Sequence, residues 1–237
     1  MRARCLLLPW LLAFSAVADA PSADISQLIL EKYLSAQERQ RASMKGVEMD
    51  VEIRASIPRL AKSGSLQALR VISKLGRITY QALRFEGDNT VKKDVIARYI
   101  FSEIQASENP NDELAITPVN YKFKGKGLQY RDAREVYVLE LNPRRKAVGL
   151  FKGEVWLDPA TGLPVRESGR LVKSPSVFIR KVEFVRDYEI REGVAIPTKL
   201  TSYADTRIVG RTELSVAYSN FHKVLDQVDP VTTVTQR

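Results

Sequence analysis

The sequence predicts an α+β fold in which a curved antiparallel β-sheet covers two α-helices. Short segments of alternating apolar and polar residues follow one another from Glu135 to Phe221, as is typical of antiparallel strands. A hairpin signal lies among them, because Asp158 opens a turn and Gly162 tolerates a positive φ. Two segments with helical spacing lie in the first half of the chain. The apolar face of each must pack against the strands.

The first twenty residues, 1–20, have the pattern of a secretory signal peptide. Arg2 and Arg4 give a positive start, an apolar segment runs from Cys5 to Val17, and small residues follow. Cleavage after Ala18 and cleavage after Ala20 both fit. The apolar segment is too short to span a bilayer comfortably, so we expect an exported mature chain. That chain has no cysteine, and its own core must stabilise it.

The mature chain is predicted to begin with an amphipathic helix from Ile25 to about Ala42, capped by Asp24. A second helix is predicted after Asn89 or Thr90, either of which can cap it. The strands predicted in the first half are Val47–Ile57, Gly64–Ser73, Arg77–Phe85 and a shorter extended stretch at Tyr121–Lys124. Those predicted in the second half are Glu135–Leu141, Gly149–Leu157, Leu163–Val172, Val177–Ile190, Val194–Ala204 and Val209–Phe221.

The residue types argue against an enzyme. His222 is the single histidine, and no cysteine remains after cleavage, which excludes most zinc and copper sites. Nucleophilic catalysis by serine needs a base, and His222 lies beside the end of the last predicted strand. We therefore expect no catalytic residue, no metal and no cofactor.

Apolar and aromatic side chains on the predicted strands are the candidates for an apolar ligand cavity under the helices. The alternative is that they fill an ordinary core. The cavity candidates are Tyr137, Leu139, Trp156, Phe178, Phe184 and Tyr188.

The chain carries a formal net charge of +9, and the mature chain would carry a similar positive charge. Such a balance favours anionic partners, such as lipid head groups or an acidic protein. Arg144, Arg145 and Lys146 form the compact basic cluster and are the candidates for a contact surface. The alternative interpretation is a solvated basic surface.

The order of these motifs resembles a known family. The chain has a signal peptide, an amphipathic helix, a strand meander and an internal helix, then VYVLELNPRRK (Val136–Lys146), GEVWLDPATGLPVRESG (Gly153–Gly169) and DYEIREGVAIPTKL (Asp187–Leu200). It is similar in this to the outer-membrane lipoprotein-sorting proteins of the bacterial periplasm, the LolA/LolB-like superfamily, which includes envelope-stress sensor domains.

The resemblance covers most of the mature chain. It implies an unclosed half-barrel over the N-terminal and internal helices as one domain, residues 21–221, with a polar tail at 222–237. It also implies an apolar cavity that accepts acyl chains. The lipoprotein carrier of this family has an arginine near the barrel rim that holds its lid closed, and Arg70, Arg77 and Arg84 are the alternatives for that arginine here.

We therefore expect a monomeric periplasmic protein that binds or carries an acyl chain, a lipid or a lipoprotein. The alternative function is a sensor or protein-interaction module that contacts a membrane-bound envelope protein. No nucleic acid is expected as a partner.

Overall fold

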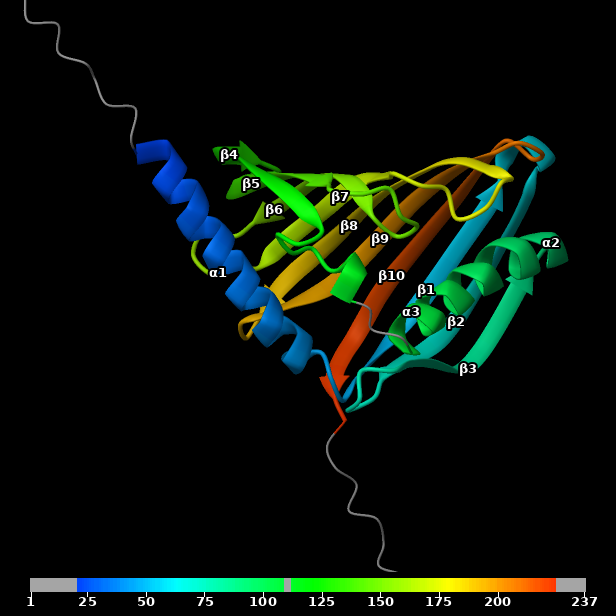
Figure 1. Ribbon diagram of the computed structural model, residues 1–237. Coiled ribbons are helices and arrows are strands. Elements are labelled where there is room, and N and C mark those ends of the chain that lie inside the picture. Colours follow the sequence, from blue (N-terminus) through cyan, green and yellow to red (C-terminus); the bar gives the residue numbers. More distant parts are fainter. Residues whose placement is uncertain (1–20, 109–111, 225–237) are drawn as a thin grey trace, which may run out of the picture.

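The structure, a computed structural model, describes residues 21–108 and 112–224. Within these residues one antiparallel sheet has the strand order β3-β2-β1-β10-β9-β8-β7-β6-β5-β4 (Figure 1). Strands β3 and β4 are the two edges and do not pair with each other, which confirms the unclosed half-barrel. The strands are β1 (Val47–Ile57), β2 (Lys62–Ile72), β3 (Ile78–Gly87), β4 (Tyr121–Arg131), β5 (Arg134–Pro143), β6 (Phe151–Leu157), β7 (Pro164–Leu171), β8 (Ile179–Arg191), β9 (Val194–Thr206) and β10 (Arg211–Lys223).

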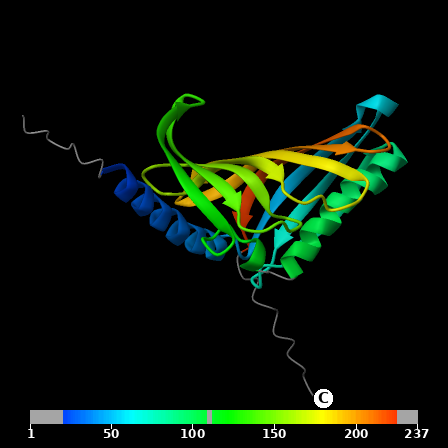
Figure 2. The same cartoon turned by 45° about the horizontal axis from the view of Figure 1, so that its top comes forward.

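Two helical segments lie under the arch of the sheet and diverge from each other (Figure 2). The first is α1 (Pro21–Ser43). The second begins as α2 (Asn89–Val91), passes through π-helical turns (Lys92–Ala97) and continues as α3 (Arg98–Glu108). Both cover the same concave face, so this face of the sheet is sheltered. Part of the opposite face is also buried, because Val136 and Val138 of β5 form a small cluster there with Trp156.

The core is divided between the two helical segments. Strand β1 alternates as predicted and buries Val47, Met49, Val51, Ile53, Ala55 and Ile57 under the internal helix. A second cluster packs under α1 and includes Tyr33, Tyr121, Leu139 and Leu150. Phe184 of β8 packs against both clusters. The middle of the sheet is therefore where the two halves of the core meet.

Helix α1 is fixed to the sheet by polar contacts as well as by its apolar face. The side-chain amide of Gln40 donates to the carbonyl of Ala195 in β9, and its oxygen accepts from the Ala195 N–H at 2.8 Å. Near the middle of the helix, Lys32 Nζ donates to the Pro159 carbonyl at 2.9 Å. These bonds satisfy backbone groups at the ends of strands and set the helix position.

Both predicted helix caps are wrong. Helix α1 begins at Pro21, so Asp24 lies inside it. The internal helix is capped by Asp88, whose Oδ1 accepts from the Thr90 N–H at 2.8 Å. Gly87 ends β3 with a φ of +86°, so the chain turns one residue earlier than expected and presents Asp88 at the cap position.

Strand β4 is longer than predicted, and strand β10 has the predicted length but is shifted by two residues toward the C-terminus. Strand β4 extends to Arg131, because a bulge between Gly125 and Leu128 absorbs the two glycines that look like a turn in the sequence. Strand β10 ends at Lys223, two residues inside the predicted tail. The predicted signal peptide and residues 225–237 of that tail lie outside the described residues. In the described part of the chain, no helix has the length and apolarity needed to cross a membrane.

Candidate functional site

The concave face holds a cavity of about 650 Å³ between the internal helix, the segment 114–116 and strands β6 to β10. Each strand contributes the residues whose side chains point toward the helices, at a spacing of two. The apolar part of the lining includes Val95, Ile116, Phe151, Val182, Phe184 and Leu200. The rings of Phe151 and Phe184 meet edge to face with centroids 4.9 Å apart. The cavity is therefore apolar over most of its wall.

A band of charged side chains borders this cavity. Arg70 of β2 is 7% exposed and donates to Glu103 of α3 through Nε at 3.1 Å and Nη2 at 3.3 Å. The hydroxyl of Tyr80 also donates to Glu103. Burial raises the pKa of Glu103, but the charge and hydrogen bonds of Arg70 outweigh it, so this pKa lies below its ordinary value. Arg70 is the one of the three candidate rim arginines that contacts the internal helix.

The same band continues across the sheet to a second cavity of about 270 Å³ next to the C-terminal half of α1. Glu103, Glu167 and Arg186 line both cavities. Arg186 Nη1 lies 3.6 Å from Glu167 Oε2, and the hydroxyl of Tyr188 donates to the same oxygen at 2.9 Å. The two arginines and two glutamates of the band balance in charge, so an apolar ligand would meet no uncompensated ion.

A third cavity, of about 440 Å³, lies between the first half of α1 and strands β4 and β5. Leu139 lines it together with Leu30, Leu34 and Phe123. Next to it, the hydroxyl of Tyr137 is 2.8 Å from Ser26 Oγ of α1. Tyr137 itself is 2% exposed and belongs to the core under α1.

The six predicted cavity residues therefore do not line one common cavity. Phe184 lines the main cavity, Tyr188 the second and Leu139 the third. The expectation for Trp156 needs correction, because its ring contacts Arg131 and Arg166, whose guanidinium carbons are 4.9 and 4.8 Å from its centroid. Its neighbours Val155 and Leu157 point into the core under α1, so Trp156 points to the opposite face of the sheet.

Phe178 also lines none of the three cavities described above. Strand β8 begins one residue later, at Ile179, and a register shift follows in its pairing with β9. Phe178 lies in the preceding loop and is 56% exposed. The alternation along the sequence placed it in phase with Phe184, but the shift breaks this phase.

The basic cluster supports the cavity wall. Arg144 Nε donates to the Pro118 carbonyl at 2.8 Å, and Arg145 Nη2 donates to the Glu113 carbonyl at 2.9 Å. Arg145 Nη2 also lies 3.2 Å from the Glu113 carboxylate. Both arginines thus hold the segment that contributes Leu114 and Ile116 to the main cavity. Lys146 is exposed.

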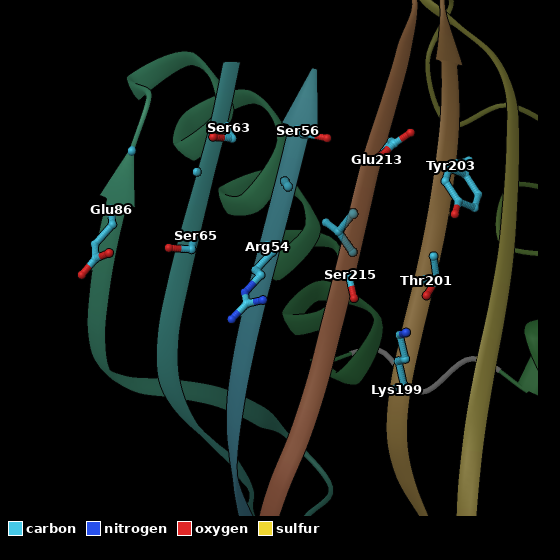
Figure 3. A pocket seen from close by; sticks show the side chains of 14 residues that line it. Arg54, Ser56, Ser63, Ser65, Glu86, Lys199, Thr201, Tyr203, Glu213 and Ser215 are labelled. Atoms are coloured by element: carbon cyan, nitrogen blue, oxygen red, sulfur yellow. The ribbon is translucent and has the colours of Figure 1, made fainter. Parts of the chain in front are cut away.

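A polar hollow of about 640 Å³ lies on the other face of the sheet and crosses five strands (Figure 3). Its lining is rich in short hydroxyl side chains, including Ser56, Ser63, Ser65, Thr201 and Ser215, with charged groups such as Arg54, Lys199 and Glu213. None of the residues predicted from the sequence to form a site lines this hollow. The signal was the serines and threonine that alternate with buried residues along β1, β2, β9 and β10.

His222 has contacts that do not suit a general base. Its Nδ1 lies 2.7 Å from the Asn220 carbonyl and its Nε2 lies 2.6 Å from Glu48 Oε1. Both neighbours are acceptors, so both ring nitrogens donate and the imidazolium form is favoured. The Asn220 carbonyl and then Glu48 accordingly raise the pKa of His222. Among the described residues, no group of three His, Cys, Asp or Glu side chains could hold a metal ion.

No protein-family model and no curated protein matches the sequence. Solved structures do match. A LolA superfamily protein from Nitrosomonas europaea is 16% identical, with 85% of this chain and 94% of that chain covered and a TM-score of 0.43. A putative outer membrane lipoprotein-sorting protein domain from Vibrio parahaemolyticus is 12% identical, with 85% and 95% covered and a TM-score of 0.49.

A DUF1329 family protein from Desulfovibrio piger is 12% identical, with 86% of this chain and 95% of that chain covered and a TM-score of 0.46. The names of the first two structures match the LolA/LolB-like resemblance of the sequence. At these identities the likeness concerns the fold alone.

Proposed function

We propose that the protein binds the acyl chain of a lipid or lipoprotein in the main concave cavity and carries it within the cell envelope. The observation that supports this is the apolar wall of the cavity, whose volume of about 650 Å³ suits a small apolar ligand. Ligand pockets typically measure about 300–1,000 Å³ and combine apolar walls with few polar groups. Each buried methylene of a ligand contributes about 0.8 kcal/mol to binding.

The charged band limits the kind of ligand. Arg70 and Arg186 already have carboxylate partners in Glu103 and Glu167. An ionic head group placed there would have to displace a buried partner and would leave it unpaired, which is unfavourable. The apolar end of a ligand is therefore the part that fits inside, and its polar end would stay in solvent.

We propose that the internal helix is the part of the wall that moves when the ligand enters. Val95, Tyr99 and Glu103 all line the cavity from this helix. The Arg70–Glu103 contact holds the helix on the sheet, so opening would separate this pair. Helix α1 is fixed separately, through Gln40 and Lys32, and we propose that it stays in place.

We expect Ala204→Trp to weaken binding of a fluorescent fatty acid by about tenfold or more, because the indole would occupy cavity volume. Titration of the purified protein with the fatty acid measures this. The matched control is Thr201→Trp on the same strand, since Thr201 lines the hollow on the opposite face. Equal affinity for Ala204→Trp and wild type, with both folded, would remove the support for the cavity as the binding site.

Charge reversal in the basic cluster should distinguish support of the cavity wall from recognition of a protein partner. We expect Arg145→Glu to weaken fatty acid binding severalfold, since it repels Glu113 and releases the wall segment. Lys146→Glu, which changes the same charge at the next residue, should leave binding unchanged. A surface that recognises a protein partner through this cluster predicts the opposite pattern, with fatty acid binding retained in both variants.

We further propose that the protein is exported to the periplasm. The basis is the signal-peptide pattern of residues 1–20. Mass spectrometry of the protein recovered from the periplasmic fraction checks this, since the mature chain should begin at Asp19 or Pro21.

A further inference from the structure

One end of the sheet carries several exposed apolar side chains on three loops. We call this surface the tip, and it consists of the β1–β2 loop (58–61), the β7–β8 loop (172–178) and the β9–β10 loop (207–210). Its apolar side chains are Leu60, 44% exposed, Val177, 78%, Phe178, 56%, and Ile208, 67%. Exposed apolar groups gathered in one place mark an interaction surface more often than singly scattered ones do.

The three loops form one surface at the upper right of Figure 1. The backbone N–H of Arg207 donates to the Phe178 carbonyl at 2.9 Å, and its Nε donates to the Val177 carbonyl at 2.9 Å. A Cβ placed on Gly210 would lie 3.5 Å from Arg59 Cδ, so the first and third loops are also in contact. The hydrogen bonds fix the backbone of Val177 and Phe178 to the third loop, and both side chains are exposed.

The tip is also cationic. Its loops contain Arg59, Lys173 and Arg207 and no acidic residue. Two acidic residues beside the tip are paired with cations of their own, Asp88 with Lys62 at 3.3 Å and Asp205 with Arg211 at 3.1 Å. The exposed arginines and lysine of the tip therefore face solvent with their charge uncompensated by neighbouring carboxylates.

We infer that the tip is a docking surface for a bilayer that contains anionic lipids. Apolar side chains that project beyond a ring of cations suit the membrane interface, where the apolar groups enter the boundary of the acyl chains and the cations contact head groups. An acidic protein surface would be complementary to the cations but would leave Val177, Phe178 and Ile208 without an apolar environment. Charge and apolarity together favour the bilayer.

The position of the tip relates it to the main cavity. Phe178 directly precedes Ile179, and Ala204 and Thr212 stand at the strand ends that flank the third loop. Ile179, Ala204 and Thr212 all line the cavity. A docked tip therefore brings this end of the cavity close to the bilayer. The inference goes beyond the proposed function, because the surface would bind a bilayer whatever the cavity holds.

Vesicle flotation tests the inference, with phosphatidylcholine vesicles made with and without phosphatidylglycerol. The wild-type protein should bind the anionic vesicles and release them as salt rises. The double variant Val177→Ser/Phe178→Ser should bind about tenfold less well, since it loses the apolar contact. Arg59→Glu/Lys173→Glu should also lose about tenfold or more, because each basic residue near an anionic surface contributes about fivefold.

Matched controls come from the β2–β3 turn at the opposite end of the sheet. Leu75 is 77% exposed there, and Leu75→Ser should leave vesicle binding unchanged. Lys74→Glu/Arg77→Glu should reduce it far less than the charge reversal at the tip. Fatty acid binding in solution should survive in all tip variants, so failure of the cavity proposal and failure of this one give different results.

Two outcomes would overturn the inference. One is equal binding of the wild-type protein to neutral and anionic vesicles, or no binding to either. The other is an equal loss of binding when the tip and the opposite end are changed, which would show that net charge alone governs the contact.

Discussion

Replacing Glu103 with alanine should lower the free energy of unfolding by about 3–5 kcal/mol, because it leaves a buried cation without its partner. Arg70 is 7% exposed and its guanidinium has two hydrogen bonds to the Glu103 carboxylate. The hydroxyl of Tyr80 loses its acceptor in the same variant. Urea unfolding followed by fluorescence measures the change.

The matched control is Glu108→Ala, which removes an exposed glutamate from the same helix and should cost less than about 0.5 kcal/mol. Replacing both partners, in Arg70→Met/Glu103→Met, should restore much of the stability, since no unpaired charge remains. A loss below about 1 kcal/mol for Glu103→Ala would show that water reaches Arg70 and that the internal helix is not held by this pair.

Acid should weaken the same contact. The pKa of Glu103 is lowered in the fold, so its contribution to stability is fully present above the pKa of an unfolded glutamate, about 4.3. That contribution is lost as the pH falls through the lower pKa of the folded state. The stability difference between the wild type and Glu103→Gln should therefore narrow at acidic pH.

Replacing Gly153 with valine should destabilise the fold by roughly 3 kcal/mol, because no space exists for a side chain between β6 and β7. A Cβ on Gly153 would lie 1.9 Å from the Ser168 carbonyl oxygen and 2.6 Å from Gly169 Cα. Both obstacles are backbone atoms, so the clash can be relieved only by separating the strands. Thermal unfolding measures the loss.

The effect should reach the cavity as well. Gly153 pairs with Gly169, and a Cβ on Gly169 would lie 2.5 Å from a ring carbon of Phe151, which lines the cavity. Gly153→Val should therefore also weaken fatty acid binding. Lys152→Val, one residue earlier at an exposed position of the same strand, is the control and should change neither property. If Gly153→Val were as stable as the wild type, β6 and β7 could not approach each other closely at Gly153 and Gly169.

The sequence predicted the elements well where one kind of pattern was dominant. Strand β1 alternates without interruption and has the predicted bounds. The β6–β7 turn follows its sequence signal, since Asp158 Oδ1 accepts from the Thr161 N–H at 2.7 Å and Gly162 has a φ of +73°. In both places the local chemistry alone determines the conformation.

The candidate site was harder to predict, because the face of the sheet to which a side chain points depends on how the strands pair with one another. Trp156 stands between Val155 and Leu157, so apolarity alone does not say which of the three points inward. The charged band could not be predicted either, since Arg70 and Glu103 are partners only because the internal helix folds back over β2. The basic cluster looked like a surface feature, and its bonds to the segment before β4 appear only in the folded chain.

The position of β1 between β2 and β10 has a consequence for the order of folding. Its partner on one side is β2, the next strand in the chain, but on the other side it pairs with β10, so that Val47 lies opposite Lys223. During synthesis the first three strands must wait for the last one before the sheet is continuous. Such distant pairing makes folding slow. The nascent chain would therefore have no continuous sheet until its last strand has been synthesised.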